Sequence, residues 1–555
     1  MKSALHHRHA LTGGLILAFC SALLGPVAPT QANDVQPGTD DQGQPAHLSL
    51  GASDLPEHRT VSTLAPGVTL TKISRGGADS SLFWTAEVAM PSDSPDPDAP
   101  ASALSSQVKA QATADKLKAA GIDARVEHVQ SPQLADAGGD LGYRVRSGRF
   151  TTKADGASTA AKIKAAGFSS SVIYTGWDGD ADTISTTRGP WNLEVITIDP
   201  KQYKGQLTGS FGADLEKRET TSQMAAGAHA LAAVNAGFFV MDPRAGAEGD
   251  PAGVGVYGGK VLSEPVADRP ALVVDGNRNS TSVQRLTWSG SVSSASSTAP
   301  LDGIDRVPGL IRNCGGAHDL PTPLALHDTT CTNANEMVTF TADFGPSTPA
   351  GPGMEVAVDS HDTVTAVSET RGMPVPAGGH TVQAIGSDVS VLRALAPVGA
   401  KLKIDAGLRN QDGHPLPMNK STTVLNGGPL LVKNGVEEVT AKHDGMVHPN
   451  DSNSFYYGWV HKRNPRTFAG TDAQGRTLLV TADGRSTASL GLSLKEEADV
   501  ATSLGMVQAM NFDGGGSTTA VAGGAVLNTP SDGTERPVGD TLLVLPGREE
   551  QRDAH

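Results

Sequence analysis

The sequence predicts an α+β protein, with a large strand-rich domain of few helices and a small domain of βαββαβ order. An internal repeat in the first third of the chain indicates the small domain. Many short apolar runs between glycine-rich turns, with one clear amphipathic helix near the C-terminus, indicate the large one. A chain of 555 residues is also too long for a single compact core, so more than one domain is expected.

The composition suits soluble globular domains and argues against one class of partner. The chain is 38% hydrophobic and 19% charged, and it contains 64 glycines and 35 prolines, which favours loops and strands. Its formal net charge of -15 argues against nucleic acid as a partner, because phosphate contacts need clustered Lys and Arg. A local basic pocket for a phosphate-bearing substrate remains compatible with this total.

Residues 1–32 are typical of a secretory signal peptide. Lys2 and Arg8 precede an apolar run from Leu11 to Leu24, and Thr30-Gln31-Ala32 offers a small-residue cleavage site. This run is short for a membrane span, so we expect no transmembrane anchor after cleavage; a retained anchor is the alternative. Residues 33–58 are polar and rich in Gly, Pro, Asp and Gln, which predicts a disordered lead.

Signal cleavage would remove Cys20 and leave Cys314 and Cys331. An even cysteine count in an exported chain favours a disulfide between these two residues. Two free buried thiols are the alternative.

The repeat lies in residues 82–178. Leu117-Lys118-Ala119-Ala120-Gly121 recurs as Ile163-Lys164-Ala165-Ala166-Gly167, and each copy predicts a helix that ends at a glycine. Strand-like runs are expected at 82–88, 124–129, 143–150 and 170–175, which gives the order strand, helix, strand, strand, helix, strand.

This order and the doubled helix ending resemble the SPOR domain, a bacterial module that binds peptidoglycan glycan strands. The resemblance implies peptidoglycan as a partner and a bacterial protein that is secreted, extracellular or associated with the cell wall. A generic ferredoxin-like domain without a ligand is the alternative. Tyr143, Arg144 and Arg146 lie on one predicted strand, and alternation places both arginines on the same face.

The large domain is expected to span 188–547, and polar residues follow several of its apolar strands. The run from Val507 to Phe512 leads into Asp513, then Gly514, Gly515, Gly516, Ser517, Thr518 and Thr519. Glycines allow backbone N–H groups to approach a ligand closely, and a row of such groups can bind an anion. This turn therefore predicts a cradle for a phosphate; a purely structural turn is the alternative.

Three further segments carry candidate site residues. Asn235 ends an apolar strand from Ala232, Arg466 follows Asn464-Pro465, and Asp483 ends the strand from Leu478. Arg466 is suited to bidentate phosphate binding. If the strands that end at Asp483 and Asp513 are neighbours, two carboxylates would face one cleft, as glycoside cleavage commonly requires.

These segments together resemble the phosphodiester glycosidase family, which includes the animal N-acetylglucosamine-1-phosphodiester α-N-acetylglucosaminidase, or uncovering enzyme. The matching runs are Val234 to Phe239, Leu425 to Leu431, Arg466-Thr467, Val480 to Gly484, and Asn511 to Thr518. The chain has Phe512 where the family usually has Leu, and Asn464 where it often has His. If that His transfers a proton in the family, the transfer is in doubt here.

The resemblance implies hydrolysis of the bond between a sugar C1 and a phosphodiester, in a wall polymer or an exopolysaccharide. We expect Arg466 and the backbone of Gly514, Gly515 and Gly516 to bind phosphate. Asp513 and Asp483 are expected to act on the anomeric carbon or on water, and Asn235 to orient a hydroxyl or the phosphate. The remaining substrate-binding candidates are Ser517, Thr518, Asn426 and Gly427. A phosphodiesterase that cuts the P–O bond and a non-catalytic envelope-binding protein are the rival functions.

No cofactor is required by these motifs, and a divalent cation stays an open question. His327, Asp328, Asp305 and Glu336 lie in an insertion over 290–380, but their spacing is not that of a tight ligand set.

Residues 60–76 resemble the first strand of the glycosidase domain. We therefore expect the SPOR-like unit to be inserted within that domain and residues 60–75 to pair with its sheet.

Overall fold

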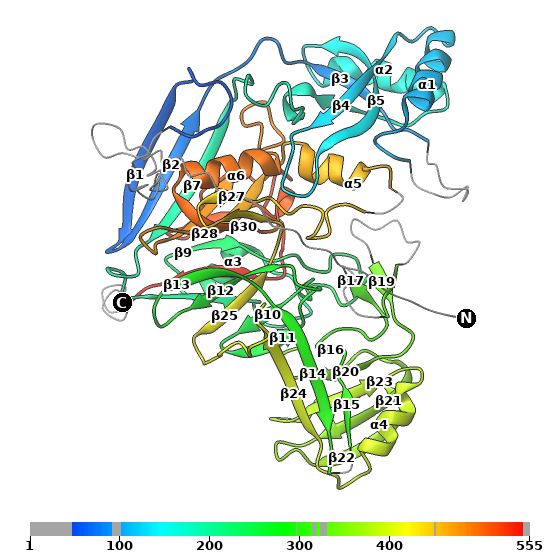
Figure 1. Ribbon diagram of the computed structural model, residues 1–555, viewed down its shortest axis with the longest axis vertical. Helices are drawn as coiled ribbons and strands as arrows, with labels where there is room; N and C mark the ends of the chain where they lie inside the picture. The colour runs from blue at the N-terminus through cyan, green and yellow to red at the C-terminus, as the bar shows by residue number, and fades with distance from the viewer. Residues whose placement is uncertain are drawn as a thin grey trace, which may run out of the picture.

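An eight-stranded antiparallel sheet organises the large domain and combines strands from distant parts of the chain (Figure 1). The computed structural model describes residues 47–91, 101–295, 297–312, 318–321, 330–448 and 451–547. In sheet order the strands are β1 (Glu57–Ala65), β2 (Val68–Arg75), β7 (Trp191–Ile198), β29 (Thr477–Ala482), β28 (Arg466–Asp472), β30 (Met506–Asn511), β26 (Leu430–Lys433) and β27 (Val436–Glu437).

The first two strands belong to this sheet although the small domain follows them in the chain. β2 pairs antiparallel with β7 along its whole length, from Val68 opposite Ile198 to Arg75 opposite Trp191. β7 in turn pairs with β29. The small domain is therefore inserted between two adjacent strands of the large domain's sheet.

Two five-stranded sheets pack against one face of the large sheet. The first has the order β32 (Ala525–Val526), β31 (Ala520–Ala522), β9 (Ala232–Asn235), β33 (Thr541–Leu545) and β8 (Gln206–Ser210). The second has the order β11 (Lys260–Ser263), β10 (Gly255–Tyr257), β25 (Thr422–Asn426), β12 (Pro270–Asp275) and β13 (Ser280–Arg285). A shared apolar core that includes Ile196, Val234, Leu425 and Met510 fills the space between the layers.

Helix α6 (Leu494–Ser503) covers the opposite face of the large sheet. It begins with the expected capping box, in which the Ser493 side chain accepts from the Glu496 N–H and the Glu496 side chain accepts from the Ser493 N–H. Leu494, Ala498 and Ala501 are fully buried in the core on this face. A short α-helix and a π-helical turn, α5 (Ser454–Tyr456) and η3 (Tyr457–His461), continue this layer toward the small domain.

The small domain has the predicted order of elements. Its sheet runs β4 (Ala124–Ser131), β5 (Gly139–Phe150), β3 (Trp84–Val88) and β6 (Ser170–Tyr174), with helices α1 (Gln107–Ala119) and α2 (Ala157–Ala165). The glycines predicted to end the helices, Gly121 and Gly167, have positive φ angles of 76° and 90°. Val145 packs with both helices, so the helices cover the sheet face opposite Arg144 and Arg146.

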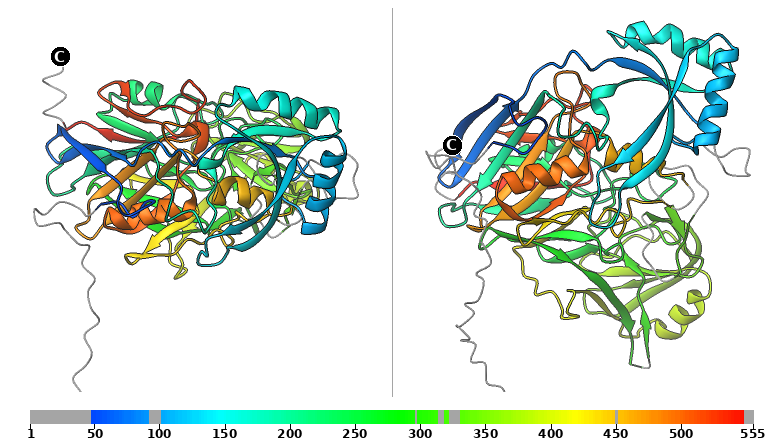
Figure 2. Two further views of the ribbon diagram at one scale, coloured as in Figure 1. Left: turned by 90° about the horizontal axis from the view of Figure 1, so that it is seen from above. Right: turned by 45° about the horizontal axis from the view of Figure 1, so that its top comes forward.

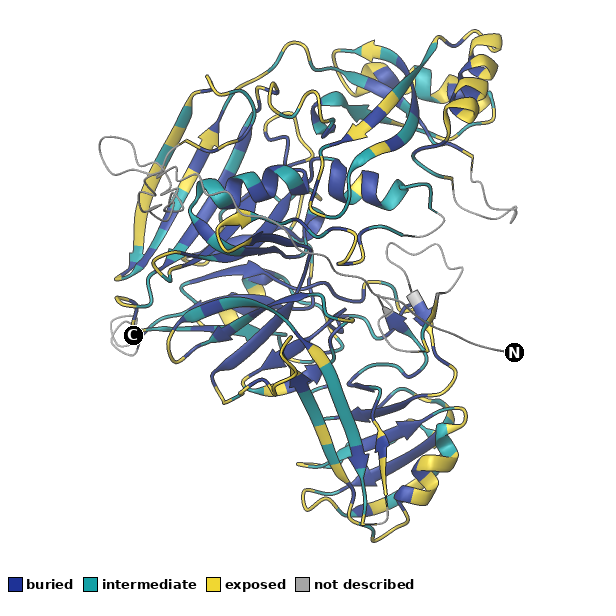
Figure 3. Ribbon diagram, viewed as in Figure 1, coloured by how far each residue is buried: buried dark blue, intermediate teal, exposed yellow. Residues whose placement is uncertain are grey.

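A third group of strands lies at the end of the molecule opposite the small domain (Figures 1 and 2). Its five-stranded sheet has the order β16 (Gly303–Ile304), β20 (Met337–Phe340), β23 (His380–Ala384), β21 (Gly351–Val358) and β22 (Val364–Arg371), and it packs against α4 (Asp388–Leu395). The remaining strands of the structure are β14 (Thr287–Ser293), β15 (Thr298–Pro300), β24 (Lys403–Arg409), β17 (Ile311–Arg312), β18 (Leu320–Pro321) and β19 (Thr330–Thr332). One more α-helix, α3 (Thr221–Gly227), lies between β8 and β9 in the chain. Figure 3 shows that the outer faces of α1 and α4 are exposed, whereas the strands of the large domain are mostly buried.

The predicted disordered lead over 33–58 is wrong for its last part. Leu48, Leu50 and Leu55 are buried in the core that contains Trp191, because apolar side chains among polar neighbours were enough to anchor this segment. The predicted signal peptide and Cys20 lie outside the described residues. In the described part of the chain, no helix combines the length and the apolar character needed to cross a membrane.

Candidate functional site

The candidate site lies at one edge of the large sheet, where three consecutive strands meet. β28 runs antiparallel to both β29 and β30, so the start of β28 at Arg466 lies between the ends of the other two strands. Asp483 and Asp513 follow those two ends. The strands that carry the two aspartates are therefore separated by β28, so the condition of direct neighbours is not met, although both strands end at the same edge of the sheet.

Asp513 is half-buried, and hydrogen bonds of its main chain to neighbouring segments hold it in place. Its N–H donates to the carbonyl oxygen of Ala236 at 2.8 Å. Its carbonyl oxygen accepts from Nδ2 of Asn235 at 2.7 Å. Its Oδ1 atom accepts from the N–H of Gly514 at 3.0 Å. These bonds fix the residue between β9 and β30, so the carboxylate has a defined position at the sheet edge.

Asn235 is fully buried and joins three segments of the site. Besides its bond to Asp513, its Oδ1 atom accepts from Oγ1 of Thr467 at 2.7 Å and from the N–H of Thr519 at 3.0 Å. These bonds all go to protein groups. The geometry thus gives Asn235 a positioning role, whereas contact of this side chain with a substrate stays a prediction.

The backbone of the glycine turn is largely occupied by internal hydrogen bonds. The N–H of Gly514 donates to Asp513, and that of Gly515 donates to the carbonyl oxygen of Pro465 at 2.8 Å. Those of Ser517 and Thr518 donate to the carbonyl oxygens of Gly514 and Gly515. An anion at this turn would therefore depend on side chains more than on a row of backbone N–H groups.

Two arginines flank the turn, and sequence reasoning did not select either of them. A Cβ atom added at Gly515, where φ is +62°, would lie 3.1 Å from Nη2 of Arg485. A Cβ atom added at Gly516 would lie 2.1 Å from Nη2 of Arg536. The glycines are thus needed for the close approach of both guanidinium groups. Oδ2 of Asp532 would lie equally close to a Cβ atom at Gly516, at 2.1 Å, so a phosphate at this turn would meet the two arginines together with one carboxylate.

Each flanking arginine is oriented by a neighbour. Nε and Nη2 of Arg485 donate to Oδ1 of Asn464 at 3.1 and 3.0 Å. Burial, and then repulsion from Arg536, lower the pKa of Arg485. Arg536 forms an ion pair with Asp532 at 2.6 Å. Asn464, which stands where the related family often has His, therefore holds an arginine at the turn.

Arg466 is buried and is bound by protein groups. Its Nε donates to the carbonyl oxygen of Leu492 at 2.9 Å, and its Nη2 donates to that of Trp459. Its guanidinium carbon lies 4.8 Å from the ring centroid of Trp459, and Nε lies 3.8 Å from the buried carboxylate of Glu497. Burial lowers the pKa of Arg466 to about 10. The charge of Arg466 interacts with that of Asp513, but its N–H donors bind mostly to carbonyl oxygens of the protein.

Asp483 forms a second acidic centre with Glu194 of β7. Its Oδ1 atom accepts from the N–H of Thr529 at 2.8 Å, and burial raises its pKa. Oε2 of Glu194 accepts from Oγ1 of Thr481 at 3.0 Å. Burial, and then the charge of Asp483, raise the pKa of Glu194 to about 7. Glu194 was also missed by sequence reasoning, since its proximity to Asp483 depends on the pairing of β7 with β29.

The other predicted binding residues have structural contacts. Oδ1 of Asn426 accepts from the N–H of Phe238 at 2.9 Å, and a Cβ atom added at Gly427 would lie 2.5 Å from the carbonyl oxygen of Asn511. Ser517 is fully buried beside Arg536, and Oγ1 of Thr518 is buried without a hydrogen-bond partner among the described residues. Oγ1 of Thr519 is in the same situation, so the turn has two hydroxyl groups without a hydrogen-bond partner among the described residues.

The metal and disulfide predictions concern the insertion. His327, Asp328 and Cys314 lie outside the described residues, and Cys331 is fully buried in β19. The pairing of the two cysteines therefore stays a prediction. The carboxylate of Glu336 is bound to Arg306, and that of Asp305 accepts from Thr341. Within the described part of the chain, no three His, Cys, Asp or Glu side chains are grouped so that they could hold a metal ion.

The two arginines predicted on the small domain's sheet are buried against the large domain. Nη2 of Arg144 donates to Asp180 at 2.6 Å, and Nη1 of Arg146 donates to Asp178 at 2.6 Å. From η3, the hydroxyl of Tyr457 donates to Glu87 at 3.0 Å. This face of the small domain's sheet is therefore a domain interface, which the sequence could not indicate.

Comparisons with known proteins agree with this description. The family model "Phosphodiester glycosidase" matches residues 352–545, which include Asn426, Arg466, Asp483 and Asp513, and the model "SPOR domain" matches residues 101–174. A solved structure titled "Putative exported protein", from Burkholderia pseudomallei, is 32% identical with a TM-score of 0.79; the match covers 90% of this chain and 99% of that one.

The chain contains a phosphodiester glycosidase domain, which the family model matches over residues 352–545. The mouse N-acetylglucosamine-1-phosphodiester alpha-N-acetylglucosaminidase is 32% identical over 116 residues, or 21% of this chain. The bovine enzyme of the same name is 27% identical over 200 residues, or 33% of this chain. The chain spans only 22% and 37% of the length of those two relatives. It also carries a SPOR domain, inserted between β2 and β7.

Proposed function

We propose that the protein is a hydrolase that cleaves the C1–O bond of a sugar-1-phosphodiester. The names of the mouse and bovine enzymes support this reaction type, because they describe removal of a sugar from a phosphodiester. The candidate substrates are wall polymers or exopolysaccharides with sugar-1-phosphate links, because a SPOR domain accompanies the glycosidase domain.

The observation that carries this proposal is the position of Arg485 and Arg536 on the glycine turn that begins at Asp513. One guanidinium lies against Gly515 and the other against Gly516. The Asp513 carboxylate accepts from the N–H of Gly514 in the same turn. A phosphate bound by the arginines would therefore place its esterified sugar carbon next to a carboxylate.

The chemistry asks the protein chiefly to stabilise charge. Water adds to C1 as the C1–O bond breaks, and the electron pair of that bond leaves with the phosphate monoester. Because a phosphate ester is a good leaving group, little proton transfer to it is needed, and the arginines stabilise its added charge. Asp513 would stabilise the positive charge that develops at the anomeric carbon or accept a proton from water.

Asp483 and Glu194 supply the second acidic centre of the proposed site. Burial raises the pKa of Asp483, and the pKa of Glu194 is raised to about 7, so Glu194 can exchange a proton near neutral pH. In this proposal the pair is the alternative to Asp513 as acceptor of the proton that the attacking water loses.

The SPOR domain would hold the enzyme on peptidoglycan outside the cytoplasm, as expected for an exported chain. Its buried arginines point to the domain interface, so glycan strands would bind to surfaces other than that of Arg144 and Arg146. The exposed outer sides of α1 and α2 belong to those surfaces.

Hydrolysis of synthetic sugar-1-phosphodiesters in ¹⁸O water tests the proposal. Label in the released sugar would support C1–O cleavage, whereas label in the phosphate would identify a phosphodiesterase. Binding to purified peptidoglycan without turnover of any diester would indicate a non-catalytic envelope-binding protein. Asp412→Asn, at an exposed turn residue, is a matched control for Asp513→Asn.

A further inference from the structure

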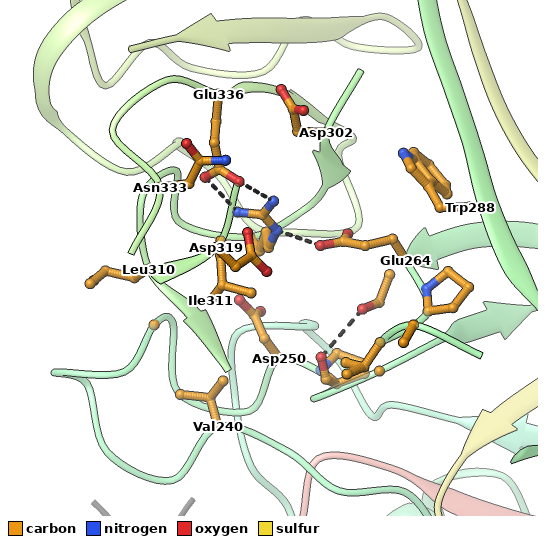
Figure 4. Close-up of a pocket in the computed structure, with 18 of the residues that line it drawn as sticks. Val240, Asp250, Glu264, Trp288, Asp302, Leu310, Ile311, Asp319, Asn333 and Glu336 are labelled. Carbon is orange, nitrogen blue, oxygen red and sulfur yellow. Dashed lines mark hydrogen bonds and ion pairs between the residues drawn. The ribbon is translucent and has the colours of Figure 1, made fainter. Parts of the chain in front are cut away.

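A cavity of about 330 Å³ lies away from the glycine turn, between the loops of the large domain and the insertion (Figure 4). Val240, Asp250 and Glu264 line it from one side, and Asp302, Arg306 and Glu336 from the other. All of these residues precede the segment that matches the phosphodiester glycosidase model. The cavity is therefore a feature of this chain beyond the matched part of the family domain.

The lining of the cavity is acidic. Its carboxylates are those of Asp250, Glu264, Asp302, Asp319 and Glu336. The guanidinium of Arg306 is already committed, because it forms ion pairs with Glu264 and, at 2.7 Å, with Glu336. The five lining carboxylates outnumber the one lining arginine. The cavity therefore favours a cationic ligand.

Asp250 points to a ligand independently of the overall charge. The residue is only 3% exposed, yet neither of its carboxylate oxygens has a hydrogen-bond partner among the described residues. Figure 4 shows its carboxylate on the cavity side, beneath Asp319. An unpartnered carboxyl group in such a position is costly, and a bound donor would remove that cost.

The surroundings of Asp250 are electrostatically unfavourable to its charge. Burial, and then the charges of Asp305, Glu216 and Glu264, raise the pKa of Asp250 well above its usual value, although Arg306 opposes this shift. A ligand that brings its own positive charge would compensate these carboxylates and favour the ionised form of Asp250.

The walls favour an organic cation over a metal ion. No group of three metal-ligating side chains occurs in the described ranges. Trp288, Val240 and Leu310 provide apolar surface next to the carboxylates. A cavity of this size is at the lower end for small-molecule sites, and an aromatic wall can pack against a sugar ring or a cation.

We propose that this cavity binds an amine-bearing monosaccharide, with its ammonium group donating to Asp250 and its ring packed near Trp288. This ligand site goes beyond the proposed glycosidase function, because none of the residues that hold the ligand belongs to the glycine turn. Its occupation requires no hydrolysis and can be measured in the absence of any phosphodiester.

Calorimetric titration of the full chain with glucosamine at about pH 6.5, where an amine is protonated, tests the proposal. We expect a Kd of about 1 mM or tighter for glucosamine and no measurable binding of glucose, which lacks the amine. Asp250→Asn should weaken binding more than tenfold while leaving the melting temperature unchanged or higher, because it removes a buried carboxyl group. Asp412→Asn should bind like the wild type.

Three outcomes would overturn this assignment. Equal binding of glucosamine and glucose would show that the amine is not recognised. Undiminished binding by Asp250→Asn would place the ligand elsewhere. Heat from calcium chloride but not from glucosamine would identify a metal site instead. Because all of these are binding measurements, they are independent of whether the chain hydrolyses a sugar-1-phosphodiester.

Discussion

The Asn235 side chain holds Asp513 by its main chain. Nδ2 of Asn235 donates to the carbonyl oxygen of Asp513 at 2.7 Å, while Oδ1 accepts from Thr467 and Thr519. One buried amide therefore connects β9, β28 and both ends of the glycine turn. The position of the candidate catalytic carboxylate therefore depends on a residue that forms these hydrogen bonds within the protein.

Replacing Asn235 by Ala should impair both stability and activity. The change leaves the carbonyl of Asp513, the hydroxyl of Thr467 and the N–H of Thr519 without this partner, and we expect the free energy of unfolding to fall by about 3 kcal/mol. Urea denaturation measures this loss. Asn410→Ala removes an amide from an exposed turn and should cost less than about 1 kcal/mol. An equal loss in both variants would contradict the special role of Asn235.

Asp513→Asn should abolish turnover without unfolding the protein. The amide can still accept the bond from the Gly514 N–H, but it cannot supply the negative charge that the anomeric centre requires. We expect kcat to fall at least about a hundredfold on a synthetic sugar-1-phosphodiester. Circular dichroism and melting temperature should match the wild type. Full activity in a folded variant would remove Asp513 from the mechanism.

Asn464→Ala should weaken substrate binding through Arg485. Without the Oδ1 acceptor, the guanidinium at Gly515 loses the group that orients it. We expect KM to rise about tenfold, which corresponds to about 1.4 kcal/mol, with a smaller change in kcat. Arg485→Gln should raise KM further. If Arg485→Gln leaves KM unchanged, the phosphate does not bind at this side of the turn.

Local sequence signals predicted the parts of the fold that local chemistry determines. Gly121 and Gly167 end helices because glycine adopts positive φ readily, and Ser493 with Glu496 caps α6 within one turn of chain. The Asp513 turn was also predicted, since a strand, a carboxylate and three glycines are contiguous in the sequence.

Residues brought together by sheet order could not be predicted in the same way. Arg485 and Arg536 meet at the turn only because β28 lies between β29 and β30 and the last loop folds back. Glu194 approaches Asp483 through the pairing of β7 with β29. The burial of Arg146 depends on domain docking, which periodicity does not encode.

Glu194 should make stability fall as pH rises from about 5 to 7. Its pKa of about 7 in the folded protein exceeds that of an unfolded glutamate, so the folded state binds more protons in this range. Its contribution to stability is therefore full at lower pH and is lost as pH rises. In Glu194→Gln the free energy of unfolding should vary with pH by about 2 kcal/mol less than in the wild type. Glu369→Gln, at an exposed residue with a lowered pKa, should keep the wild-type slope; identical slopes in both variants would contradict this role.

The interface between the SPOR and glycosidase domains should depend strongly on Asp178. This buried carboxylate accepts from both terminal nitrogens of Arg146, at 2.6 and 2.8 Å, and Asp178→Asn would leave a buried guanidinium with less negative charge. We expect a loss of about 3 kcal/mol in unfolding free energy, together with faster proteolysis between the domains. Asp54→Asn breaks an exposed pair with Arg188 and should cost far less, although its chemistry is the same. If the two variants are equally stable, burial does not determine the contribution of the Arg146 pair, and the docking of the SPOR domain must depend on its apolar contacts instead.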